Sequence, residues 1–191
     1  MEYSLVEYIK PNIIKQTNYI NERKEVYIRD LPNRYKVIVE NYHHIDPNVN
    51  FWDQKVIIVY EIIDLYTPPK QICEIGRNYP SFTAVYVRQN NYDYLITSGD
   101  YQSITIINLT KKEIKEYTDT NRRKKGWGFC PIWFNADEDY LCIEGCVWGG
   151  DMERMHCYNI NFENPIEAFN NAEWSDDENN FYEDIDEEEC Y

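Results

Sequence analysis

Thiols, a carboxylate and an imidazole gather in the last third of the sequence, and together they could bind zinc. The group consists of Cys142, Glu144, Cys146, His156 and Cys157. Side chains alternate along a strand with period two, so the first three would share one face. A hairpin would bring His156 or Cys157 across from that face, and zinc accepts thiolate, carboxylate and imidazole ligands. One hypothesis is therefore a zinc-dependent enzyme built on Cys142, Glu144, Cys146 and His156.

The spacing of these cysteines is weaker evidence than the residue types. Cys142 and Cys146 form a single Cys-x3-Cys pair, whereas strong zinc motifs carry two Cys-x2-Cys pairs. A redox or nucleophilic cysteine needs an electropositive, accessible setting, which the neighbouring Glu144 and Asp151 oppose. Cysteine is also among the residues most often buried in cores. We therefore expect reduced, buried thiols, with no catalytic residue, no metal and no other cofactor.

Three further motifs lack the context that their chemistry requires. His43 and His44 fall in a polar loop, where no regular element would fix the geometry of a metal or acid-base site. The segment 126–129 has two glycines but lacks the third glycine and the following helix of a dinucleotide-binding fingerprint. The basic run 122–125 is interpreted as a solvated loop, or as a docking point for a phosphate or for the chain's own acidic end. A nucleotide site is therefore not expected.

Aromatic residues in or near turns favour a different activity, which is binding to another protein. The aromatics that would lie in or near turns and converge on one end of the strands are Tyr101, Trp127, Trp148 and Trp174. Aromatic anchors of this kind dominate protein interfaces. The alternative is that Trp127 and Trp148 cap the core. Of the four, Tyr101, Trp127 and Trp148 are the candidate partner-binding residues.

A repeat in the sequence predicts the elements that position these side chains. Residues 94–99 form an apolar run that ends at glycine, and residues 103–109 form a second run that ends in an Asn-Leu step. The same order returns about 46 residues later at 140–145 and 154–160, where it ends in Asn159-Ile160. Strand, glycine turn, strand and polar exit at this spacing are typical of a four-stranded antiparallel meander, the unit of a propeller blade.

An all-β fold of about three such meanders is therefore predicted for a β-repeat domain at 23–170, after an irregular N-terminal arm at 1–22. The predicted strands are 25–29, 35–40, 55–64, 71–75, 83–88, 92–98, 103–108, 113–117, 130–134, 140–145, 154–159 and 165–169. Closed propellers typically need four to eight blades. Three meanders would therefore form a propeller-like or open, twisted arrangement with the arm over one edge, or two chains would join their exposed edges.

The charge of the chain is concentrated at its C-terminal end. The formal net charge is −15, and ten acidic residues with no Lys or Arg lie from Glu173 onward. The remainder holds 24 acidic and 19 basic residues. Such a run repels itself and buries little apolar area, so residues 171–191 are predicted to be a disordered acidic tail. A body of this charge is not expected to bind nucleic acid directly.

The sequence shows neither a targeting signal nor a membrane span. The first seven residues include Glu2 and Glu7 and lack the apolar core of a signal peptide. No run approaches the roughly 20 apolar residues of a membrane helix. A cytoplasmic protein without membrane contact is expected.

Four motifs, at 77–82, 94–109, 126–130 and 144–148, occur in an order that resembles a known family. They are similar to those of uncharacterised, short, propeller-like (WD40-like) β-repeat proteins from bacteria and large DNA viruses. The resemblance covers about residues 51–160 and implies a propeller-like fold without an established activity. If the source is viral, the protein would reside in the host cell or the virion. The family's Pro-Asp-Gly turn is replaced here by residues 135–139, and the acidic tail is particular to this chain.

Three functions follow from these observations. The leading one is a non-catalytic β-repeat protein that binds another protein through its loops, and a homo-oligomer is kept as a further arrangement. The first alternative is the zinc-dependent enzyme described above. The second is an acidic decoy, whose C-terminal tail would occupy the basic surface of a nucleic-acid-binding partner.

Overall fold

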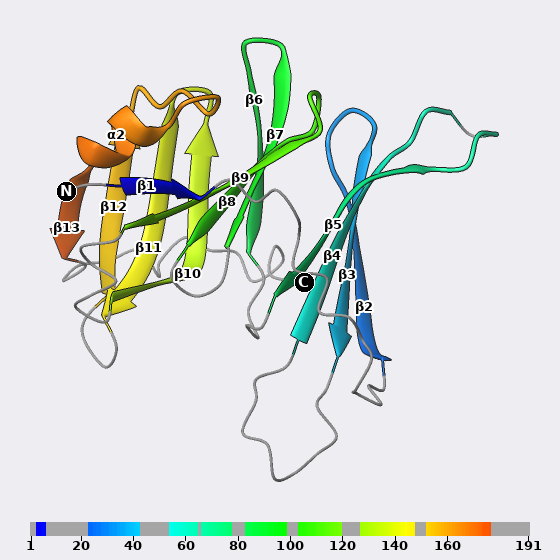
Figure 1. Cartoon of the computed structure of the whole chain (residues 1–191), viewed down its shortest axis with the longest axis horizontal. Helices are drawn as coiled ribbons and strands as arrows, with labels where there is room; N and C mark the ends of the chain where they lie inside the picture. Colours follow the sequence, from blue (N-terminus) through cyan, green and yellow to red (C-terminus); the bar gives the residue numbers. More distant parts are fainter. Residues whose placement is uncertain are drawn as a thin grey trace, which may run out of the picture.

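The structure, a computed structural model, describes residues 3–6, 23–42, 54–64, 66–77, 83–98, 103–119, 127–147 and 152–176. Within them, side chains are described over 28–40, 57–64, 66–75, 83–97, 103–117, 135–145 and 153–175. Three antiparallel sheets and one short helix form the regular structure of these ranges (Figure 1). The predicted open, all-β fold is confirmed.

The first sheet contains four strands in sequence order. They are β2 (Arg23–Asp30), β3 (Tyr35–Tyr42), β4 (Gln54–Glu61) and β5 (Lys70–Arg77). One face of β3 and β4 is buried through Val37, Val39, Ile57 and Val59, as the period-two alternation of a half-buried strand requires. Asn33 takes a positive φ of 66° in the turn between β2 and β3, a conformation that asparagine tolerates well.

The second sheet contains five strands, because the N-terminal segment joins its edge. In sheet order they are β1 (Tyr3–Val6), β9 (Glu113–Asp119), β8 (Ile104–Asn108), β7 (Tyr92–Ser98) and β6 (Ala84–Gln89). Asn90 and Asn91 both have positive φ, which fits a two-residue hairpin turn between β6 and β7. The arm was expected over one sheet edge, and β1 extends such an edge by pairing with β9.

The third sheet contains β10 (Trp127–Asp137), β11 (Tyr140–Val147), β12 (Met152–Tyr158) and β13 (Glu173–Asp176). Its last strand differs from the sequence prediction. The segment 165–169, predicted as a strand, falls largely in helix α2 (Ile166–Asn170), and Pro165 caps that helix. Helical spacing places Ile166 and Phe169 on one side, where Phe169 is buried and Ile166 packs against the core.

The start of the predicted acidic tail is also different. Residues Glu173–Asp176 pair antiparallel with β12, and Trp174 packs against the core of the second and third sheets. The apolar area of this tryptophan explains why an acidic segment enters a sheet. Residues 177–191 lie outside the described part of the chain.

The second sheet packs between the other two and contributes to two hydrophobic cores. On one side, Leu95, Ile107 and Leu109 join the core of the first sheet. On the other side, Tyr94, Ile96 and residues of the third sheet form a second core. Its buried members are Val87, Tyr94, Ile96, Ile104, Ile106, Tyr117, Leu141, Ile143, Met155, Cys157, Ile160, Phe162 and Phe169. Burial on both faces explains why every residue of β8 is buried.

One backbone hydrogen bond recurs at the same position in all three sheets. The amide of Ile62 donates to the carbonyl of Arg34 at 2.6 Å. The amide of Leu109 donates to Asp93 at 2.8 Å, and the amide of Ile160 donates to Asp139 at 3.0 Å. In each sheet, the acceptor directly precedes a tyrosine of the second strand, and the donor follows the third strand.

Candidate functional site

The residues of the zinc hypothesis divide between the two faces of the third sheet. Cys142 lies directly across from His156, and Glu144 lies across from Arg154, so these four side chains share the face turned away from the second sheet. Cys157 instead lies across from Leu141 in the core, on the opposite face. The expectation that a hairpin would bring His156 near Cys142 is met, whereas Cys157 cannot join the same site.

The described members of this group are already bound to protein side chains. His156 contacts the Tyr140 hydroxyl through Nδ1 at 2.8 Å and the Ser175 hydroxyl through Nε2 at 3.0 Å. Glu144 accepts a hydrogen bond from Arg154 Nε at 3.2 Å, and both side chains are largely buried. Among the described residues, no three His, Cys, Asp or Glu side chains come together as a metal would require. Cys146 belongs to β11, but its side chain lies outside the described ones.

Burial sets the protonation of these groups. It raises the pKa of the Cys157 thiol to about 12, and it also raises the pKa of Cys142. Burial, together with the positive charge of Arg154, lowers the pKa of His156. Both thiols are therefore protonated and His156 is neutral near pH 7, which suits packing and hydrogen bonding. The thiolate is the nucleophilic form, so neither cysteine is poised for covalent chemistry.

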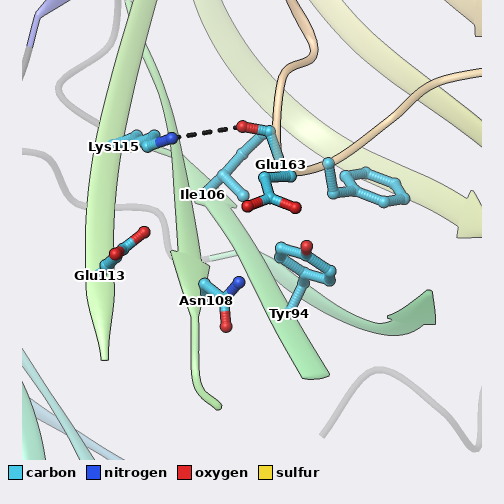
Figure 2. A pocket seen from close by; sticks show the side chains of 7 residues that line it. Tyr94, Ile106, Asn108, Glu113, Lys115 and Glu163 are labelled. Atoms are coloured by element: carbon cyan, nitrogen blue, oxygen red, sulfur yellow. Dashed lines mark hydrogen bonds between the residues drawn. The ribbon is translucent and has the colours of Figure 1, made fainter. Parts of the chain in front are cut away.

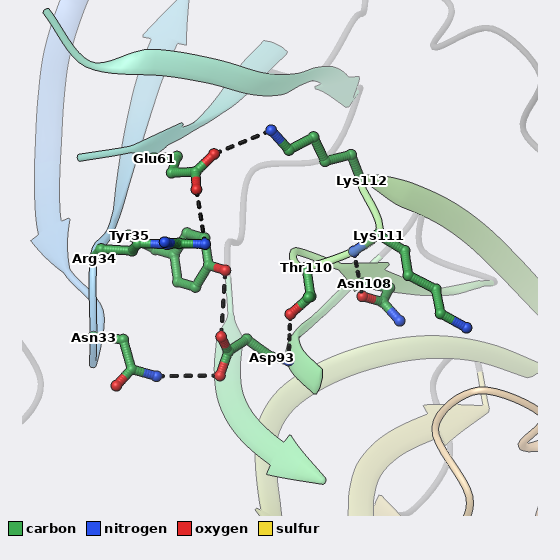
Figure 3. Close-up of polar contacts among 9 residues, drawn as sticks. All are labelled: Asn33, Arg34, Tyr35, Glu61, Asp93, Asn108, Thr110, Lys111 and Lys112. Carbon is green, nitrogen blue, oxygen red and sulfur yellow. Dashed lines mark hydrogen bonds and ion pairs between the residues drawn. The ribbon is translucent and has the colours of Figure 1, made fainter. Parts of the chain in front are cut away.

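A polar network joins the first and second sheets where their hairpins meet (Figure 3). Asp93 is its centre: its carboxylate accepts hydrogen bonds from Tyr86 at 2.5 Å, Asn33 at 3.1 Å and Tyr35 at 3.3 Å. The amide of Asp93 also contacts the Thr110 hydroxyl at 3.0 Å. Burial and the Asp93 carboxylate raise the pKa of Tyr86, so the tyrosine remains a donor.

Glu61 forms the second centre of this network. The carboxylate is 9% exposed and lies 2.9 Å from Arg34 Nη2 and 3.0 Å from Lys112 Nζ (Figure 3). The Lys112 hydrogen bond and the two nearby positive charges hold the pKa of Glu61 below its usual value, against the effect of burial. Lys112 lies in the turn between β8 and β9 of the second sheet, so its ion pair with Glu61 ties the first and second sheets together.

Gln89 makes the corresponding link between the second and third sheets. Its side chain is 6% exposed and donates to the carbonyls of Glu138 at 2.5 Å and Ile160 at 2.7 Å. The same amide group accepts a hydrogen bond from the amide of Phe162 at 2.9 Å. One side chain thus satisfies three backbone groups of the neighbouring repeat.

A small hollow lies beside this link, between the second sheet and the loop before α2 (Figure 2). Its walls include Tyr94, Asn108 and Glu163, and Lys115 Nζ donates to the Glu163 carbonyl at 3.2 Å. Lys111 also pairs with the Glu163 carboxylate and lies over the Tyr92 ring. The volume of about 10 Å³ holds about one water molecule and no organic substrate.

The turn between β4 and β5 is the most exposed apolar feature of the described residues. Tyr66 is 97% exposed and Ile63 is 57% exposed. Asp64 organises this turn: it accepts hydrogen bonds from the amides of Tyr66 and Thr67 and from the Thr67 hydroxyl, each at 2.7 Å. The Thr67 bond is the main cause that lowers the pKa of Asp64. Figure 1 shows this hairpin projecting outward from the first sheet.

The partner-binding residues predicted from the sequence lie outside the described side chains. Trp127 begins β10 without a described side chain, and Tyr101 and Trp148 fall in undescribed segments, so their role stays a prediction. Sequence reasoning missed Tyr66. Its signal was a tyrosine beside the turn-forming sequence Thr67-Pro68-Pro69, where an aromatic side chain is hard to bury.

The comparisons with known proteins give a distant similarity. The chain is 30% identical over 118 residues to an uncharacterised protein of Acanthamoeba polyphaga mimivirus. That relative is a viral protein. The matched residues make up 61% of this chain and 43% of the relative, so the chain spans less than half of the relative's length. No family model and no solved structure matches the chain. No helix within the described residues is long and apolar enough to cross a membrane.

Proposed function

We propose that the protein is a non-catalytic β-repeat scaffold that binds another protein through its projecting turns. The observation that carries this proposal is the ordered, exposed tip at Ile63 and Tyr66. A tip held by three hydrogen bonds loses little conformational freedom when it binds. A tyrosine supplies a large, rigid contact area, and tyrosine is one of the residues most often found as an interface anchor.

The use of the polar side chains supports a scaffold over an enzyme. Asp93, Glu61 and Gln89 each make more than one polar contact, and each joins neighbouring sheets. His156 and Glu144 are hydrogen-bonded within the third sheet. These contacts support structural rather than catalytic roles for the groups that could do chemistry. The acidic-decoy hypothesis depends on residues 177–191, outside the described part, and stays a prediction.

The partner that fits this tip is a protein with an apolar pocket for one tyrosine side chain. A photoreactive phenylalanine analogue placed at position 66 tests this directly. We expect one discrete cross-linked adduct in an extract of the expressing cells. Unlabelled wild-type protein should compete for the adduct, whereas the Tyr66→Ser variant should compete at least tenfold less well, because removing an anchor of this kind costs about 2 kcal/mol or more of binding free energy.

The matched control carries the same analogue at Glu167, an exposed position on α2. It should give no adduct of the same mass. An identical adduct pattern at both positions, or none at position 66, contradicts binding through this tip.

A further inference from the structure

The three sheets stack on one another in the same orientation. Each has a tyrosine at the same place in its second strand: Tyr35, Tyr94 and Tyr140. We call the side of each sheet that carries this residue the tyrosine face. Tyr35 is buried in the core shared with the second sheet, and Tyr94 is buried in the core shared with the third sheet. The tyrosine face of one sheet therefore packs on the back of the next sheet.

Strand register confirms that these faces are equivalent. Tyr35 pairs with Glu61, Tyr94 pairs with Asn108, and Tyr140 pairs with Tyr158. On the back of the second sheet, Leu95 and Ile107 face the first sheet, and on the back of the third sheet, Leu141 and Cys157 face the second. The stack of three sheets thus has a direction, because both of its sheet-on-sheet contacts join a tyrosine face to the back of the next sheet.

This direction leaves two unlike faces at the ends of the described stack. The tyrosine face of the third sheet presents a cluster of three rings, Tyr140, His156 and Tyr158, with each pair of ring centroids 5.3 to 6.3 Å apart. The back of the first sheet presents the cross-strand row Ile28, Ile38 and Ile58. Ile28 is 61% exposed and Tyr158 is 52% exposed, so each end face carries a large apolar side chain in contact with solvent.

The second and third sheets also fan out, as the blades of a propeller do. Strand β6 of the second sheet lies close to strand β10 of the third. Helix α2 contacts β1 and β12 at the outer side of the same two sheets, where the Phe169 ring meets Tyr117 edge-on at 5.4 Å. The two sheets are therefore close together at β6 and β10 and held apart by α2 at β1 and β12. Sheets that diverge in this way are arranged around an axis.

We propose that a second copy of this chain completes the fan, with the tyrosine face of the third sheet on the back of the partner's first sheet. The contact continues the one already made twice within the chain. In a two-fold pair it forms twice, and six sheets close the ring. Six lies within the four to eight blades of closed propellers, whereas one copy supplies three and three copies would supply nine.

The expected contact area also favours a closed pair over an open chain of copies. A four-stranded face with strands of about eight residues covers roughly 500 Å², so one sheet-on-sheet contact buries about 1,000 Å² in total. Two such contacts bury about 2,000 Å², which lies in the range of stable interfaces, while a single contact falls short of it. Closure into a pair therefore forms both contacts together.

Sedimentation of the full chain with two single variants tests this proposal. We expect wild-type protein to sediment at twice the chain mass of 23.1 kDa. Ile28→Lys and Tyr158→Glu should each sediment as one copy, because each puts a charge in both contacts of the pair. Both positions are more than half exposed, so the far-ultraviolet circular dichroism of each variant should stay that of a folded protein. The Tyr66→Ser control, in the turn between β4 and β5 and outside both the isoleucine row and the aromatic cluster, should remain a pair.

Mixing the two variants distinguishes a contact between unlike end faces from a contact between two copies of the same end face. A mixed pair keeps one contact intact and sets a lysine against a glutamate in the other, so the mixture should associate although each variant alone does not. Three results overturn the proposal: a single-copy mass at all concentrations, a mass that climbs past two copies, or a pair that survives both substitutions. The control variant lacks the proposed partner anchor, so a failure here is distinguishable from a failure of partner binding.

Discussion

Cys142 and Cys157 occupy opposite faces of one hairpin, and burial gives them the same chemical state. Cys157 lies in the core between the second and third sheets, and Cys142 is 2% exposed on the other face. Burial raises the pKa of both thiols. Their protonated form is small and apolar, so they act as core side chains in the folded protein.

Thiol labelling checks this assignment. In native protein at pH 7.5, N-ethylmaleimide should modify Cys142 and Cys157 at least 100-fold more slowly than in urea, because attack requires both access and a thiolate. Peptide mass spectrometry after timed labelling measures each rate. The urea-unfolded chain is the control, since both thiols should then react rapidly. Rapid labelling of either residue in the native protein would contradict its burial.

His156 makes the stability of the third sheet depend on pH. Burial and Arg154 lower the pKa of His156 below 6.5 in the folded state. In the unfolded chain His156 becomes protonated near pH 6.5, whereas in the folded protein it stays neutral to a lower pH. The free energy of unfolding therefore decreases as the pH falls below 6.5. Urea denaturation at steps from pH 7.5 to 5.5 should show this decrease.

The matched variant is His156→Gln, which keeps hydrogen-bonding groups toward Tyr140 and Ser175 but does not titrate. Its free energy of unfolding should depend less on pH over the same interval. Equal pH dependence in the two proteins would assign the effect to other groups.

At the scale of elements, single buried polar side chains hold the repeats together. Gln89 ends β6 and satisfies backbone groups of Glu138, Ile160 and Phe162 in the third repeat. Buried donors and acceptors that lose their partner cost free energy, even though each bond contributes little net stability. The contact between the second and third sheets therefore depends strongly on the single side chain of Gln89.

Replacing this residue tests the junction. Gln89→Ala should lower the free energy of unfolding by about 3 kcal/mol, because three backbone groups lose their partner. Chemical denaturation measures the difference. The control is Gln71→Ala, where the side chain is exposed and the change should stay within about 0.5 kcal/mol. Similar small effects in both variants would contradict the proposed role of Gln89.

The strands were predictable wherever a local signal determines them. Asn90-Asn91 marks a tight hairpin, and the apolar runs around it alternate or stay buried as strands do. Helix α2 was missed because five residues are too few to show a helical period. Strand β13 was missed because acidic composition predicts solvation, while the burial of Trp174 depends on the rest of the sheet.

The polar links between sheets were not predictable from the sequence. Asp93 meets Asn33 and Tyr35, and Gln89 meets Phe162, across long stretches of chain. Such contacts depend on how whole sheets pack. The pairing of Cys142 with His156 could be anticipated, because a hairpin relates them, but the hydrogen bonds that occupy His156 could not.

At the scale of the whole molecule, the three repeats form a directional stack with unlike ends. The middle sheet is covered on both faces, while the back of the first sheet and the tyrosine face of the third sheet are not covered by a described sheet. A stack of this kind needs its ends either made polar or covered. The isoleucine row and the aromatic cluster favour covering.

The native mass of the purified chain tests the closed pair and the absence of a resident metal together, because one spectrum reports copy number and bound metal. We expect twice the chain mass of 23.1 kDa with no added metal or small molecule. A single-chain mass would contradict the closed pair. An added mass of one zinc ion per chain would contradict the expectation that the chain holds no metal.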